Sequence, residues 1–144
     1  MIIYGVCISD IKELNEEKAV DFLKELSKLG HEDYLENFIE NKHDNGEDYS
    51  FNNWCYDYES EGYFGLAAFL KDVIGEVEGV NINCDDPNGV HYLGLSADAP
   101  WCFNYKTRNI SREEYNDILR KYINAVTDEV LKIDWFVVVD DCDW

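Results

Sequence analysis

The sequence predicts one α+β domain over residues 1–144, a mixed or antiparallel four-stranded sheet with about four helices packed mainly on one face. Four short stretches are rich in β-branched and aromatic residues, and four longer ones place apolar residues at helical spacing. No internal repeat or linker divides the chain. The expected order of elements is therefore β-α-α-loop-α-β-β-α-β.

The first quarter of the chain predicts a strand and two helices. Residues 1–9 are apolar and β-branched, which indicates a strand. Asn15 followed by two glutamates is typical of a helix N-terminus, and Gly30 is a stop signal. The apolar side of this helix comprises Ala19, Phe22, Leu23, Leu26 and Leu29. A second helix is expected over Glu32–Asn41, with Tyr34, Leu35, Phe38 and Ile39 facing inward.

The stretch Asn41–Gly62 mixes acids, asparagines and aromatics without a sustained period. It predicts a long, ordered surface loop, with a short strand around Trp54–Tyr58. A third helix is expected over Gly62–Val77. Its wide apolar side predicts that it is the central, most buried helix.

The remaining elements are a hairpin, a helix and a strand. Val80–Cys84 and Val90–Leu95 predict a β-hairpin, since the linker between them contains proline and Asn-Gly. Ser111 opens a capping box for a helix. The apolar side of that helix comprises Tyr115, Ile118, Leu119, Tyr122, Val126 and Val130. Asp134–Asp140 is expected to be a closing strand buried on both faces.

Charge restricts the classes of partner. The 31 acidic residues exceed the 12 lysines and arginines, which leaves a net charge of −19. This balance argues against direct binding to DNA or RNA and against adsorption to an anionic membrane, because both need basic side chains. The sequence contains no apolar run long enough to span a membrane and no signal peptide, so a cytoplasmic protein is expected. The five cysteines, an odd number without CxxC spacing, are expected to be reduced core thiols.

The acidic residues are concentrated rather than evenly spread. Residues 40–61 contain seven acids and one lysine, Lys42, which gives a net charge of −6. More acids occur at the hairpin tip and the C-terminus. Aromatic residues lie among the seven, and two interpretations remain open: the rings pin the loop to the core, or they form an interface. The predicted partner-binding residues are Asp44, Glu47, Asp48, Tyr49, Trp54, Tyr56, Asp57, Tyr58, Glu59, Glu61, Asp85, Asp86, Asp140, Asp141 and Asp143.

The leading functional hypothesis is an acidic inhibitor or decoy that occupies the basic, nucleic-acid-binding surface of a partner protein. The same acidic character is found in two kinds of inhibitor. One kind blocks restriction or CRISPR nucleases and often comes from phages or mobile elements, and the other comprises immunity proteins against nuclease toxins. One alternative is an accessory interaction domain whose charge serves solubility. A second is a small metal-dependent enzyme. No catalytic residue, cofactor or metal site is predicted, because the three histidines are scattered and no phosphate-loop, EF-hand or zinc spacing occurs.

Overall fold

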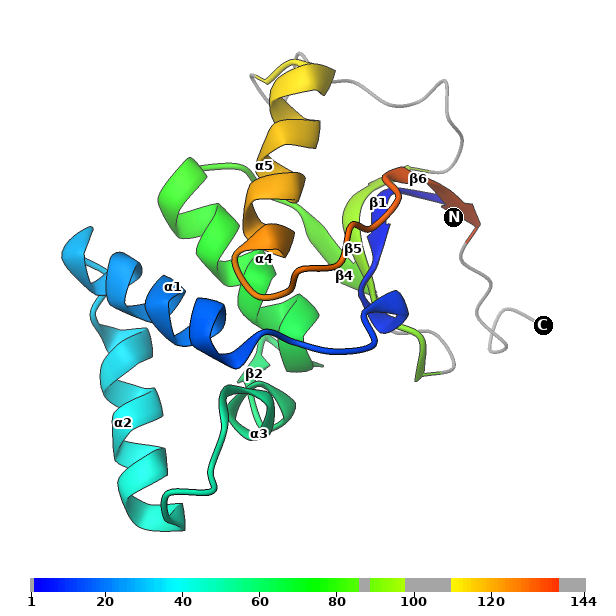
Figure 1. Cartoon of the computed structure of the whole chain (residues 1–144). Coiled ribbons are helices and arrows are strands. Elements are labelled where there is room, and N and C mark those ends of the chain that lie inside the picture. The colour runs from blue at the N-terminus through cyan, green and yellow to red at the C-terminus, as the bar shows by residue number, and fades with distance from the viewer. Residues whose placement is uncertain (1, 86–88, 98–109, 138–144) are drawn as a thin grey trace.

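Twelve elements make up the part of the chain that the computed structural model describes, residues 2–85, 89–97 and 110–137 (Figure 1). The helical elements are the 3-10 turn Ile8–Asp10, α1 Glu16–Lys28, α2 Asp33–Asn45, α3 Phe51–Tyr56, α4 Gly65–Glu78 and α5 Arg112–Asn124. The strands are β1 Ile2–Cys7, β2 Glu59–Ser60, β3 Tyr63–Phe64, β4 Asn83–Asp85, β5 Tyr92–Ala97 and β6 Asp134–Val137. The α+β class is therefore confirmed.

The main sheet has the order β4-β5-β1-β6, and every neighbouring pair is antiparallel. Gly5 and Gly94 lie opposite each other in β1 and β5. A side chain at Gly5 would come within 2.1 Å of the Leu93 carbonyl oxygen, so this close approach requires glycine. The rings of Tyr92 and Phe136, from the strands on either side of β1, approach to 5.4 Å on the same face as this pair. Because Gly5 and Gly94 have no side chains, the space above them on this face is open to the rings of Tyr92 and Phe136.

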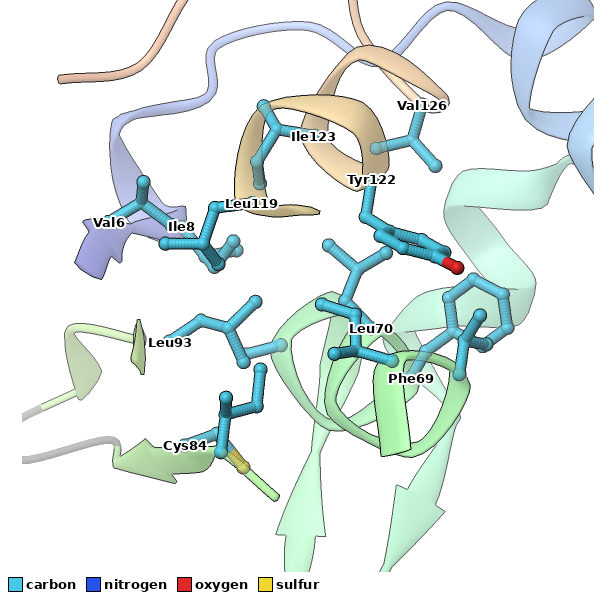
Figure 2. Packing of buried hydrophobic residues seen from close by; sticks show 14 of the residues in the cluster. Val6, Ile8, Phe69, Leu70, Cys84, Leu93, Leu119, Tyr122, Ile123 and Val126 are labelled. Carbon is cyan, nitrogen blue, oxygen red and sulfur yellow. The ribbon is translucent and has the colours of Figure 1, made fainter. Parts of the chain in front are cut away.

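The core lies between the other face of the sheet and the helices, with α4 at its centre as predicted. Six residues of α4 are buried: Ala67, Ala68, Phe69, Leu70, Val73 and Ile74. Figure 2 shows Leu70 of α4, Leu93 of β5 and Leu119 of α5 pointing into one shared interior. The hydroxyl of the fully buried Tyr115 donates a 2.8 Å hydrogen bond to the Tyr4 carbonyl, which ties α5 to β1.

Helix signals in the sequence located the start of α1 correctly. For Leu29 and Ile39, however, the prediction that they face inward is wrong. The Asn15 side chain accepts a hydrogen bond from the Lys18 N–H, as expected of an N-cap. Leu29 is 63% exposed, because it follows the last turn of α1. Ile39 is 55% exposed, because α2 turns it away from its buried neighbour Phe38.

The predicted loop Asn41–Gly62 is largely regular structure. Helix α2 continues to Asn45, and α3 replaces the expected short strand. Ser50 caps α3 in a reciprocal capping box with Asn53, and the helix buries Phe51, Trp54 and Cys55 on one side. The hairpin β2–β3 follows through Glu61 and Gly62, both with positive φ, as a two-residue turn requires. The helical periodicity of α3 could not be recognised in the sequence, because the helix is less than two turns long.

The predicted hairpin is confirmed, since β4 pairs with β5, but the prediction for the last strand is wrong. Among the described strands, β6 pairs with β1 alone and lies at the edge of the main sheet, and Val137 is 71% exposed. Residues 138–140 of the predicted strand lie outside the described residues. The apolar side of α5 also ends earlier than expected, because the helix stops at Asn124 and Val130 is 93% exposed.

Two further findings concern cysteines and membranes. Cys7, Cys55 and Cys84 are buried, as the sequence predicted for core cysteines, whereas Cys102 and Cys142 lie outside the described residues. Among the described helices, none has the length and apolar character that crossing a membrane would take.

Candidate partner-binding surface

Negative charge is concentrated in residues 32–61, called here the acidic segment, which includes α2, α3 and β2. The segment contains ten acidic residues and Lys42, a net charge of −9 out of the −19 of the whole chain. All ten acidic side chains are exposed. About a fifth of the sequence therefore carries nearly half of the net charge, on side chains that solvent and partners can reach.

Four of these acids form a line along α2. Asp33, Glu36, Glu40 and Asp44 are three or four residues apart, so they share one side of the helix. Phe38, which is buried, lies on the opposite side. At a rise of about 1.5 Å per residue, the line is roughly 16 Å long and has one carboxylate per roughly 5.5 Å. Figure 1 shows α2 at the periphery of the molecule, away from the main sheet.

An aromatic cluster holds the acidic segment against α4. The ring of Phe69 lies 5.1 Å from the ring of Trp54, 5.5 Å from that of Tyr58 and 5.8 Å from that of Phe51. Tyr34 of α2 also reaches Phe69, at 5.4 Å. Most of these contacts are edge-to-face, the geometry that aromatic pairs favour. The segment is therefore held against α4 at Tyr34 and again over Phe51–Tyr58.

Hydrogen bonds add to this fixation. The indole N–H of Trp54 donates to the Asn37 side-chain oxygen at 2.8 Å, which joins α3 to α2. The Phe51 N–H donates to both carboxylate oxygens of Glu16, at 2.8 and 2.9 Å, which joins α3 to α1. The Tyr58 hydroxyl donates to Asp72 of α4 at 2.6 Å. Burial, and then this bond to a carboxylate, raise the pKa of Tyr58.

The structure divides the predicted rings between the core and the surface. Trp54 is only 3% exposed, so its assignment as a partner-binding residue is corrected: the ring packs on Phe69 and offers a partner almost no area. Tyr49 and Tyr58 are half-buried. Tyr56 is 83% exposed, because it lies on the other side of α3 from the buried Phe51 and Trp54. Trp54 is therefore pinned to the core, while the interface interpretation stays a prediction for the exposed Tyr56.

Phe64, which was outside the predicted set, is also exposed, at 50%. It pairs with the acidic Glu59 across the β2–β3 hairpin, and it contributes a second exposed ring to the region. Its neighbour Tyr63 is half-buried. Alternation along β3 would have indicated which ring faces outward, had the hairpin been recognised.

The predicted acids of the segment are exposed, and the others are only partly covered by the structure. Asp44, Glu47, Asp48, Asp57, Glu59 and Glu61 are all exposed. Asp85 is the last residue of β4, whereas Asp86, Asp140, Asp141 and Asp143 lie outside the described residues. The acids of α2 from Asp33 to Glu40 were missed, although their three- and four-residue spacing was a readable signal.

A pocket of about 410 Å³ opens beside Tyr56 and brings Cys55 and His91 to one site. Burial, and then the nearby charge of Glu16, raise the pKa of the Cys55 thiol well above its usual range. A nucleophilic cysteine needs the opposite shift, because the thiolate is the reactive form. The arrangement therefore does not favour cysteine nucleophilic catalysis.

Comparisons with family models, with curated proteins and with solved structures found no match for this chain. The class of protein is accordingly defined by its fold and surface. It is an acidic α+β domain with a carboxylate-rich segment that bears the exposed ring of Tyr56 and is followed three residues later by the exposed ring of Phe64.

Proposed function

We propose that the protein binds a basic partner protein through the acidic segment and occupies the surface on which that partner holds nucleic acid. One observation supports this most directly: the ten exposed acids of residues 32–61 are gathered on a segment that a buried aromatic cluster holds in place. A function in solubility alone would not require the acids to be gathered or the segment to be fixed.

Charge density decides where such mimicry is feasible. Averaged over the 8686 Å² surface, a net charge of −19 is about one charge per 460 Å². Duplex DNA carries one charge per about 1.7 Å of its axis, roughly one per 110 Å² of its surface. The average surface charge density of the protein is therefore too low to resemble that of DNA. Along α2 the spacing of roughly 5.5 Å compares with about 3.4 Å per phosphate in one DNA strand, which is more than half of the strand's charge density.

Fixation of the segment favours tight binding. A mobile acidic chain loses conformational freedom when it binds, and this cost reduces affinity. The Phe69 cluster and the bond from Trp54 to Asn37 hold α2 and α3 in place before a partner arrives. Exposed Tyr56 and Phe64 add apolar area that can be buried at the centre of the contact, where aromatic residues contribute most.

Displacement of DNA from nucleases tests this proposal. A labelled duplex is bound to each member of a panel of restriction enzymes, CRISPR nucleases and nuclease toxins, and the protein is added while fluorescence anisotropy is recorded. We expect displacement from at least one enzyme, at near-stoichiometric concentration. Because exposed charges are screened within about 8 Å at physiological ionic strength, the affinity should fall steeply as salt rises.

A matched pair of charge reversals localises the effect. Glu36→Lys with Glu40→Lys changes two exposed acids on α2, and Glu17→Lys with Asp21→Lys makes the same charge change on α1 at the same spacing. The α2 pair should weaken binding about tenfold or more, the loss of roughly 1.4 kcal/mol or more, and the α1 pair should not. Equal weakening by both pairs, or no displacement by the wild-type protein, would contradict the proposal.

A further inference from the structure

The pocket beside Tyr56 combines apolar walls with carboxylates. Ile11 and Leu14, from the segment before α1, and Leu66, at the start of α4, contribute apolar surface. Tyr56 also lines the pocket and is 83% exposed, so its ring stands at the rim. A volume of about 410 Å³ is ample for one long side chain of a partner.

The charge of the pocket is negative. Glu13 and Glu16 both line it. The Phe51 N–H donates one bifurcated hydrogen bond to the two carboxylate oxygens of Glu16, and because a carboxylate has about four acceptor positions, others remain for a ligand. The charge of Glu16 also reaches the buried Cys55, where it adds to burial in raising the pKa of the thiol.

Lys12 and His91 are the basic residues of the pocket wall. The pKa of Glu129 is lowered by the backbone N–H groups of Glu13 and Lys12, and the charge of Lys12 adds to this effect. The charge of Lys12 is thus partly balanced by Glu129, which does not line the pocket. His91 is held through its backbone, whose N–H donates to the Ser9 hydroxyl at 2.8 Å. The carboxylates therefore dominate.

We propose that this pocket receives an arginine side chain of the basic partner. The guanidinium contacts Glu16 and the ring of Tyr56, and the aliphatic stem lies against Ile11 and Leu66. Arginine fits better than lysine, because its planar head stacks on aromatic rings and donates two parallel hydrogen bonds to a carboxylate. This inference rests on the proposed function, since it assigns one contact within that complex.

Small amides test the pocket without the partner. N-acetyl-arginine amide is titrated into the ¹⁵N-labelled protein, and the backbone amide shifts of Ile11, Asn52 and Leu66 are followed by NMR. We expect a saturable response at these residues. N-acetyl-citrulline amide has nearly the same shape but no charge, and it should bind about tenfold more weakly, because charge-assisted hydrogen bonds are lost. The lysine amide should also bind more weakly than the arginine amide.

Adjacent glutamates provide a matched control. Glu16→Gln removes the charge at the pocket and retains an oxygen that can accept from Phe51, whereas Glu17→Gln makes the same change at a residue outside the pocket wall. Glu16→Gln should weaken the binding of the arginine amide about tenfold, and Glu17→Gln should leave it unchanged. Leu66→Trp, which fills the pocket, should abolish the response. Equal binding of the arginine, citrulline and lysine amides, or unchanged binding of the arginine amide by the Glu16→Gln and Leu66→Trp variants, would overturn the inference.

The two proposals fail separately. If the protein displaces DNA from a nuclease but the arginine amide produces no shifts at the pocket, the pocket assignment is wrong and the proposed function stands. If the amide binds as described but no enzyme of the panel is displaced, the proposed function is wrong and the pocket remains an arginine-binding site.

Discussion

Trp54 and Tyr56 are two residues apart in α3 and have opposite environments. The indole of Trp54 is 3% exposed and packs on Phe69, while the ring of Tyr56 is 83% exposed. Two residues along a helix correspond to a rotation of about 200°, so one ring faces the core and the other faces solvent. At the scale of single residues, one aromatic ring of α3 packs in the core, and the ring two residues later is exposed and accessible to a partner.

This division predicts two different effects of truncation. Trp54→Ala should lower the free energy of unfolding by about 3–5 kcal/mol, because it leaves a cavity beside Phe69 and removes the bond to Asn37. Tyr56→Ala should change it by less than about 0.5 kcal/mol, because the ring is exposed. Urea unfolding followed by far-ultraviolet circular dichroism measures both. Similar losses for the two variants would contradict the assignment of Trp54 to the core.

At the scale of elements, α3 makes the acidic segment ordered. It is only six residues long, and isolated helices of that length are unstable. Its stability comes from the cap at Ser50 and from the contacts that Phe51 and Trp54 make with α4. The residues after it, including Asp57 and Glu59, take their positions from this helix. The cap is therefore important for the whole surface.

Removal of the cap should destabilise the domain moderately. Ser50→Ala leaves the Asn53 N–H without its acceptor, and it should cost about 1 kcal/mol of stability. Ser50→Thr retains a hydroxyl and should cost less, which makes it the matched control. The same urea experiment measures both variants. An unchanged midpoint for Ser50→Ala would indicate that packing alone holds α3.

At the scale of the whole molecule, charge is distributed unevenly along the chain. The acidic segment has a net charge of −9, whereas residues 110–132, which include α5, have five acids and four bases, a net charge of −1. Figure 1 shows α2 and α3 at one end of the molecule and α5 at the other. In the proposed complex, such asymmetry would orient the protein in the field of the basic partner and increase the rate of association.

Self-repulsion is the cost of this charge, and salt should relieve it. Raising NaCl from 10 to 500 mM should raise Tm by roughly 4 °C, which corresponds to about 1 kcal/mol for a domain of this size. Ion pairs such as Lys28 with Glu25 are exposed and contribute little, so their screening should matter less. Differential scanning calorimetry checks this. A Tm that falls with NaCl would show that favourable pairs outweigh the repulsion.

Local signals in the sequence predicted much of the fold correctly. Helical spacing and caps are encoded within a few residues, so α1 with its cap at Asn15, the buried α4, and α5 with its cap at Ser111 were identified from the chain alone. Asn-Gly between two apolar runs likewise located the β4–β5 hairpin. The expectation that nucleic acid is not a direct partner rests on the composition alone, and it stays a prediction.

Only the tertiary structure decided which acids and rings form the candidate surface. Trp54 is buried because Phe69, fifteen residues later, lies against it, and no local pattern reports that contact. Strand β6 is the edge of the described sheet and pairs with β1, whose other side is occupied by β5; the paired residues of β1 and β5 are 85 to 95 positions apart in the chain. The sequence by itself determined the amount of charge and the helices α1, α4 and α5. Exposure depends on contacts between distant segments, so the location of the surface followed from folding.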